Sequence, residues 1–194
     1  MRRPCSADPR IFSIQTQPRG ASPPPPAAAA RDASEDQIIG RLAECLRPAV
    51  RYATGHGIML AIEGEPPLVI NSPARYKKLP AAVGRKEFKV IFDPSHFDLL
   101  TGGKLRPDLL LEEPGAARIG YVQFTDGDGT LRKRPDGSTG TSRQLAAGEG
   151  KYDVGRLLEI LYRGAFRGGA PIDTWETEDP FHASRLGRGV VEAA

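Results

Sequence analysis

The chain has 194 residues, of which 39% are hydrophobic and 26% charged, and a formal net charge of +3. This length suits a single domain with a tail, and the absence of an apolar run of about 18 residues excludes a transmembrane helix. The charge is too small to indicate nucleic-acid binding alone, and two cysteines, Cys5 and Cys45, give no disulfide framework, which favours a cytoplasmic location.

The N-terminal segment differs in composition from the rest of the chain. Residues 1–33 are expected to form a disordered Pro/Ala-rich arm, because runs of proline and alanine leave little to bury. Order is expected from Ser34, which has the spacing of a helix capping box with Gln37. Apolar residues then recur at helical spacing, and Pro48 is expected to end or bend this helix.

The most distinctive stretch is a predicted hairpin. Two apolar runs, Ile58–Ile62 and Leu68–Ile70, flank a Gly-Glu-Pro-Pro turn, and their nearly continuous apolar character indicates burial on both faces. A short helix is expected near Pro80–Gly84. The run Phe88–Phe92 is predicted either as a strand or as part of a helix that continues through Leu100, because short apolar runs do not distinguish the two.

The second half of the chain contains further strand and helix patterns. Alternating side chains predict a strand at Arg118–Phe124, which would pair with Asp108–Glu112. Asp126–Gly129 has the composition of a hairpin turn, and Thr130–Arg134 would return as a charged edge strand. An amphipathic helix is expected at Tyr152–Phe166.

These elements together predict an α+β fold. Its sheet would be mainly antiparallel, with an N-terminal and a C-terminal helix packed on it. The domain would comprise residues 34–168, between the disordered arm and a C-terminal tail at residues 169–194.

The sequence shows no intact catalytic or metal-binding motif. There is no Gly-x-x-x-x-Gly-Lys-Ser/Thr loop for phosphates, and the Asp126–Gly129 segment fails as a calcium loop because Phe124 and Pro135 would occupy ligand positions. The three histidines lack a cysteine or a second histidine at zinc-ligand spacing; they are His56, His96 and His182. No catalytic residue, cofactor site or metal ligand is therefore assigned, and the chain is expected not to be an enzyme.

One resemblance to a known family rests on the hairpin. The order of a helix, an apolar strand, Gly64-Glu65-Pro66-Pro67 and a second strand resembles the N-terminal, PAS-like domain of the type IV pilus and type II secretion motor ATPases of the PilT/PilB class. Asp108–Ile119 is similar to a later part of that domain. The family's Asp-Leu-His-like pattern is replaced by Ile58-Met59-Leu60, and the ATPase core is missing. The resemblance implies a PAS-like module that binds proteins.

A second resemblance concerns nucleases. Pro107-Asp108 before an apolar strand resembles the first catalytic element of PD-(D/E)xK nucleases, but Gln123-Phe124-Thr125 stands where the metal-binding acid and the lysine belong. An intact nuclease site is therefore not expected, and a degenerate one stays open.

The resulting functional hypothesis is a non-catalytic, protein-binding adaptor or regulator associated with a type IV pilus or secretion machine. Two alternatives are a nucleic-acid-binding or degenerate nuclease-like protein and a translocated effector. A protein partner is expected, nucleic acid is an alternative partner, and the oligomeric state is left open. Contact with either partner is assigned to four basic residues, namely Lys77, Lys78, Arg85 and Lys86.

Overall fold

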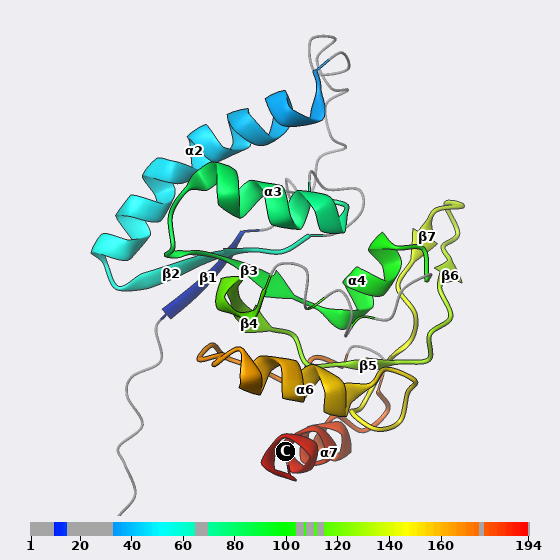
Figure 1. Ribbon diagram of the computed structural model, residues 1–194. Helices are drawn as coiled ribbons and strands as arrows, with labels where there is room; N and C mark the ends of the chain where they lie inside the picture. Colours follow the sequence, from blue (N-terminus) through cyan, green and yellow to red (C-terminus); the bar gives the residue numbers. More distant parts are fainter. Residues whose placement is uncertain are drawn as a thin grey trace, which may run out of the picture.

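A parallel sheet with helices along it forms the framework of the protein (Figure 1). A computed structural model describes residues 10–14, 33–64, 70–103, 107, 111, 115–174 and 177–193. Each sheet strand pairs in parallel with the next one along the chain, in the order β1-β2-β3-β4. The strands are β1 (Arg10–Ile14), β2 (Ile58–Ile62), β3 (Phe88–Phe92) and β4 (Ile119–Val122).

A fifth segment extends this sheet beyond β4. Tyr121 and Phe124 form parallel bridges with Gly169 and Ile172. The amide of Phe124 donates to the carbonyl of Pro171 at 2.8 Å, and that of Val122 donates to Gly169 at 3.0 Å. Residues 169–172 therefore run beside β4 in the same direction as the other strands.

Helices connect the successive strands. In Figure 1, α2 and α3 lie side by side along the β1–β3 part of the sheet, and α6 lies on the β4 side with α7 beyond it. The helices are α2 (Glu35–Gly55), α3 (Pro73–Val83), α4 (Pro94–Leu100), the short 3₁₀ turn η1 (Ala116–Arg118), α6 (Val154–Arg163) and α7 (Pro180–Ala193).

Helix α2 begins at the predicted capping box. The Ser34 amide donates to Gln37 Oε1 at 2.8 Å, and the Gln37 amide donates to Ser34 Oγ at 3.3 Å, so the first turn has partners for two free amides. Its buried face includes Ile39 and Val50, which pack onto the sheet. Pro48 lies inside the helix, which continues to Gly55.

A small antiparallel excursion separates β4 from α6. It consists of two two-stranded ladders, in which β5 pairs with β8 and β6 pairs with β7. Their bounds are β5 (Asp126–Gly127), β6 (Arg132–Lys133), β7 (Thr139–Gly140) and β8 (Gln144–Leu145).

The predicted α+β class and its antiparallel sheet are wrong. Strand β2 matches the predicted run Ile58–Ile62, but both its edges are occupied by parallel partners, so it cannot form a hairpin with residues 68–70. Residues 65–69 lie outside the described part. The physical reason is that a strand buried on both faces of a parallel sheet has the same continuous apolar run as the one taken for a hairpin.

Other local predictions have mixed outcomes. The run Phe88–Phe92 is the strand β3, and the helix follows it as α4. The predicted helix at Tyr152–Phe166 is confirmed as α6. Asp126–Gly129 does not form a simple hairpin turn, because its first two residues are β5 and pair with β8. Of the predicted strand at Asp108–Glu112, Leu111 is described and is helical.

The predicted domain boundaries stay a prediction. Strand β1 lies within residues 1–33, and the other residues before 33 lie outside the described part. Within the described residues, no helix combines the length and the apolar character needed to cross a membrane.

The turn between α6 and residues 169–172 generates a stability prediction. A Cβ added at Gly168 would clash with the backbone carbonyl oxygen of Gly120, which no side-chain rotation can relieve. We expect Gly168→Ala to lower the free energy of unfolding by about 2–3 kcal/mol. Gly189→Ala on α7 is the matched control, because nothing lies within 4 Å of its added Cβ and alanine favours a helix by about 1 kcal/mol.

Urea denaturation of the three chains measures both changes. Equal stability of Gly168→Ala and the parent chain would show that the β4 edge does not pack against residues 168–169 as described.

Candidate metal and substrate site

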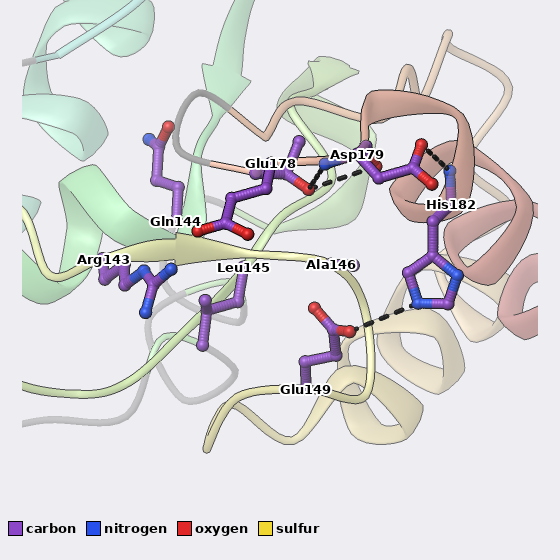
Figure 2. A pocket seen from close by; sticks show the side chains of 9 residues that line it. Arg143, Gln144, Leu145, Ala146, Glu149, Glu178, Asp179 and His182 are labelled. Carbon is purple, nitrogen blue, oxygen red and sulfur yellow. Dashed lines mark hydrogen bonds and ion pairs between the residues drawn. The ribbon is translucent and has the colours of Figure 1, made fainter.

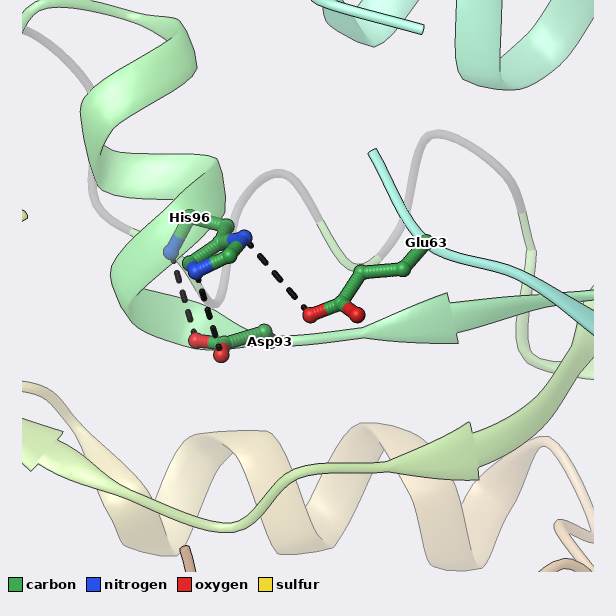
Figure 3. A group of neighbouring side chains, drawn as sticks. All are labelled: Glu63, Asp93 and His96. Atoms are coloured by element: carbon green, nitrogen blue, oxygen red, sulfur yellow. Dashed lines mark hydrogen bonds and ion pairs between the residues drawn. The ribbon is translucent and has the colours of Figure 1, made fainter. Parts of the chain in front are cut away.

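Two polar features lie among the segments that follow the carboxyl ends of the strands. One is a pocket between β8 and the start of α7 (Figure 2), and the other is a cluster of two carboxylates and an imidazole (Figure 3). Ligands of open α/β sheets bind outside the carboxyl ends of the strands, because loops from neighbouring strands converge there. Both features therefore belong to the edge where a functional site is expected.

The cluster consists of Glu63, Asp93 and His96. Glu63 directly follows β2, Asp93 directly follows β3, and His96 lies in the first turn of α4. One ligand atom from each residue lies within 4.8 Å of the other two. Nδ1 of His96 lies 3.6 Å from Glu63 Oε1, and its Nε2 lies 3.8 Å from Asp93 Oδ2.

Asp93 is fixed by its role as the N-cap of α4. Its Oδ1 accepts hydrogen bonds from the amide of Ser95 at 2.7 Å, the Ser95 hydroxyl at 2.7 Å and the His96 amide at 3.2 Å. Pro94 at the first helical position costs no hydrogen bond, since that amide has no partner within a helix. The cap leaves Oδ2 as the oxygen that faces the imidazole (Figure 3).

Glu63 is positioned through the residue that follows it. The Tyr76 hydroxyl donates to the carbonyl of Gly64 at 3.1 Å and also accepts from the Gly64 amide. A Cβ at Gly64 would clash with the Tyr76 ring, so only glycine permits this approach. The Tyr76 ring packs on Phe97 of α4, with 4.4 Å between the ring centroids. The end of β2 is thereby held against the helix that carries His96.

The cluster has the properties of a divalent-cation site. Glu63 and Asp93 are 4% and 2% exposed, and two buried carboxylates close together repel each other unless a positive charge lies between them. Two carboxylates and one imidazole suit first-row divalent ions such as Mn²⁺ or Zn²⁺. Within the described residues it is the one group of three or more histidine, cysteine or acidic side chains arranged in this way. The residues present therefore fit a metal.

Gln123 occupies the corresponding place after β4. Its amide donates to the carbonyl of Phe92 at 2.9 Å, which places it beside the end of β3. Its Oε1 is buried and has no hydrogen-bond partner among the described residues. A buried amide oxygen without a partner costs about 1–3 kcal/mol, so this oxygen is suited to a cation or a ligand hydroxyl.

The antiparallel excursion reaches the cluster through Gln144. Gln144 Nε2 donates to Ser95 Oγ at 2.9 Å, and Ser95 in turn donates to Asp93. All three side chains are buried. The loop between β4 and α6 is thus connected to a candidate metal ligand by two hydrogen bonds.

The Asp126 carboxylate holds that loop in place. It lies on β5, is 1% exposed, and accepts four backbone amides at 2.7–3.0 Å. The donors are Gly127, Gly148, Gly150 and Tyr152. An ionised acceptor with four amide donors orders the loop that carries Gln144.

A second link joins the loop to α4. The Tyr152 hydroxyl donates to Asp98 Oδ2 at 3.1 Å and lies 2.8 Å from Ser142 Oγ. Burial raises the pKa of the Asp98 carboxyl above its usual value, and the hydrogen bond from Tyr152 offsets part of that rise. Burial likewise raises the pKa of Tyr152, so its hydroxyl keeps its proton and remains a donor.

The pocket of Figure 2 has a volume of about 300 Å³ and lies beside Gln144. His182 Nε2 lies 3.5 Å from Glu149 Oε1, and the amide of His182 donates to Asp179 Oδ1 at 2.9 Å. Three carboxylates line the pocket, the third from Glu178, against the single arginine Arg143. This balance disfavours an anionic ligand and suits hydroxyl groups.

The four basic residues predicted to contact a partner lie elsewhere. Lys77 and Lys78 lie on α3, and Lys78 Nζ pairs with Glu35 Oε1 at 2.6 Å. Arg85 and Lys86 are exposed in the turn before β3, at the amino end of the sheet and opposite to the cluster. Their contact with a partner stays a prediction.

Sequence analysis missed the cluster because it sought ligands close together in the chain. His96 was excluded for lacking a second histidine or cysteine, whereas its neighbours are Asp93 in the same segment and Glu63 from the preceding strand. An acid directly after an apolar strand, followed three residues later by a histidine, was the available signal.

Comparison with known proteins identifies the architecture. A family model described as xylose isomerase-like TIM barrel matches residues 18–189. A solved structure of a D-tagatose 3-epimerase-like protein is similar with a TM-score of 0.64 and 17% identity, over 94% of this chain and 61% of that one. A search of curated proteins finds no match.

Two further structures are similar. An IolI protein with a bound zinc atom has a TM-score of 0.63 and 16% identity, over 84% of this chain and 59% of that one. D-Psicose 3-epimerase with D-tagatose, from Clostridium cellulolyticum H10, has a TM-score of 0.60 and 13% identity, over 87% and 59%. The chain therefore spans about three fifths of the length of these structures.

These findings overturn the predicted resemblances and functions. The fold is α/β and TIM-barrel-like in part, with parallel strands where a PAS-like module would have an antiparallel sheet. The likeness to motor ATPases is wrong. The non-catalytic adaptor, the nucleic-acid-binding or nuclease-like protein and the translocated effector are contradicted by the family match and by the buried cluster.

The Asp126 carboxylate generates a second prediction. Asn at this position loses the charge and turns one acceptor into a donor that faces backbone amides, so we expect Asp126→Asn to cost about 3 kcal/mol of unfolding free energy. Asp136→Asn is the control, because Asp136 is exposed and its carboxylate accepts hydrogen bonds from the amide and hydroxyl of nearby Ser138. Its expected cost is below about 1 kcal/mol.

Chemical denaturation followed by circular dichroism measures the two variants. A cost for Asp126→Asn no larger than that for Asp136→Asn would contradict the role of the four amide hydrogen bonds in holding the loop.

Proposed function

Because the chain belongs to the xylose isomerase-like TIM barrel family, we propose that it acts as a divalent-metal-dependent sugar isomerase or epimerase. The observation that carries this proposal is the buried cluster of Glu63, Asp93 and His96 at the carboxyl ends of adjacent parallel strands. The epimerases among the similar structures support the fold. By analogy with them, we propose that this chain also acts on a ketose sugar.

The residues divide into those that hold a cation and those that serve the substrate. Glu63, Asp93 and His96 would hold the ion, with Gln123 Oε1 as a further ligand. When bound, a divalent ion polarises carbonyl and hydroxyl oxygens of a sugar and so acidifies the neighbouring C–H bond. The pocket beside Gln144, with its three carboxylates, would accommodate the hydroxyl groups of an uncharged sugar.

Proton transfer is the chemical task left to the side chains. Isomerisation and epimerisation of sugars require a group that takes a proton from the carbon next to the carbonyl and returns it. Because Glu63, Asp93 and His96 would hold the cation, the proton has to be carried by a group outside these three ligands. A carrier that exchanges its proton with solvent between removal and return would introduce deuterium from D₂O into the sugar.

The first test is cation binding. We expect the full chain to bind Mn²⁺ in isothermal titration, and a concentration of 100 times the dissociation constant to raise the free energy of unfolding by about 2.7 kcal/mol. Glu63→Gln should weaken binding at least about 100-fold, because it removes a charged ligand.

Glu44→Gln is the matched control. Glu44 is exposed on α2, so this substitution makes the same chemical change as Glu63→Gln but away from the cluster. If the Glu63→Gln and Glu44→Gln variants bind Mn²⁺ with equal affinity, the cluster is not the Mn²⁺ binding site.

The second test is proton exchange. With Mn²⁺ in D₂O, ketohexoses such as D-tagatose and D-psicose should lose the NMR signal of a C–H beside the carbonyl and yield the epimer or aldose. The Glu63→Gln variant should show no exchange. Phosphorylated sugars should react more slowly because of the acidic pocket. Absence of exchange for every neutral ketose, with metal bound, would contradict the proposed function.

A further inference from the structure

The directions of the hydrogen bonds beside Asp93 can be deduced from chemistry. An ionised carboxylate only accepts, so the Ser95 hydroxyl must give its single proton to Asp93 Oδ1. The oxygen of Ser95 can then only accept from Gln144, which fixes the Gln144 amide with its NH₂ group toward Ser95. Oε1 of Gln144 is consequently turned away from Ser95, and it is buried without a partner among the described residues.

This arrangement controls which oxygen of Asp93 is available. Oδ1 has three donors, and one of them is the hydroxyl that Gln144 orients. A carboxylate oxygen with three donors has no further lone pair to offer a cation. Oδ2 is the oxygen nearest the imidazole, at 3.8 Å from His96 Nε2. A cation would therefore bind Asp93 through one oxygen.

We propose that Gln144 and Ser95 are positioning residues that set how Asp93 binds a divalent cation. The inference rests on the proposed function and names two residues that act through Asp93. Gln144 lies on β8, so the antiparallel excursion between β4 and α6 contributes to the cation site without supplying a ligand. Its place is fixed in turn by the Asp126 carboxylate, whose amide partners lie in the same loop.

The role differs from simple packing, because it predicts a change in ion preference. Without the Ser95 hydroxyl, Oδ1 keeps only its two backbone amide donors, so the Asp93 carboxylate is held by fewer hydrogen bonds and can rotate to bind a cation through both oxygens. Bidentate carboxylates suit the larger Ca²⁺, whereas Mn²⁺ prefers six ligands in a regular arrangement. Loss of the network should therefore weaken Mn²⁺ binding more than Ca²⁺ binding.

The experiment compares Gln144→Met, Ser95→Ala and the double variant by isothermal titration of the full chain with Mn²⁺ and with Ca²⁺. Each single variant should weaken Mn²⁺ binding about tenfold. Because Ca²⁺ binding should weaken less, the ratio of the Mn²⁺ affinity to the Ca²⁺ affinity should fall. The double variant should be no weaker than the worse single one, because both changes act on one oxygen. Gln37→Met makes the same chemical change in the capping box of α2 and should leave both affinities unchanged.

Three results would overturn the inference. They are unchanged Mn²⁺ affinity in both single variants, losses that add in the double variant, and equal losses for Mn²⁺ and Ca²⁺. Thermal unfolding of every variant by circular dichroism confirms that folded chains are compared.

A metal-free readout separates this inference from the proposed function. The amides of Ser95 and His96 both donate to Asp93 Oδ1 and report the same network. Their hydrogen exchange should be at least about tenfold faster in Gln144→Met than in Gln37→Met. If the chain binds no divalent ion but these amides still exchange faster in Gln144→Met, the hydrogen-bond network is supported and the proposed metal-dependent function is contradicted. Unchanged exchange would overturn the network itself.

Discussion

The site depends on one carboxylate that belongs to two structures at once. Asp93 ends β3 and begins α4, and its Oδ1 accepts three hydrogen bonds from the first turn of that helix. The cap fixes the direction in which α4 leaves the sheet and thereby the place of His96. The same carboxylate presents its other oxygen to the imidazole. A change at Asp93 would therefore disturb the helix, the imidazole and the cation site together.

Parallel pairing supplies the rest of the geometry. Because neighbouring strands run in the same direction, the residues that follow β2, β3 and β4 meet at one edge, and these residues are Glu63, Asp93 and Gln123. About thirty residues of helix and loop separate each from the next in the sequence. The loop after β4 adds Gln144 from the side, held by Asp126. Strands β2, β3 and β4 are thus each followed by one polar residue at this edge.

Local signals in the sequence were sufficient for several elements. The Ser34–Gln37 capping box fixes the start of α2, and the amphipathic pattern of residues 152–166 identifies α6, because both depend on near neighbours in the chain. Strand direction was not predictable in this way. The run Ile58–Ile62 is equally apolar in a hairpin and in a parallel sheet, and only its partners, β1 and β3, distinguish them.

The cluster was harder to predict for the same reason. Asp93 and His96 are close in sequence, but Glu63 joins them only when β2 and β3 are known to be parallel neighbours. An antiparallel hairpin places a tight turn directly after β2, so under that interpretation Glu63 is a turn residue and not part of a site. The error in topology and the missed acid–imidazole group are therefore one error, and its correction changes the functional hypothesis from a binding module to an enzyme.

A crystal structure of the full chain grown with Mn²⁺ would show directly whether this cluster holds a cation. We expect an anomalous difference peak among Glu63, Asp93 and His96, with Asp93 contributing Oδ2 while Oδ1 keeps its three donors. A peak elsewhere, or none with Mn²⁺ well above its dissociation constant, would contradict the assignment of this cluster as the metal centre.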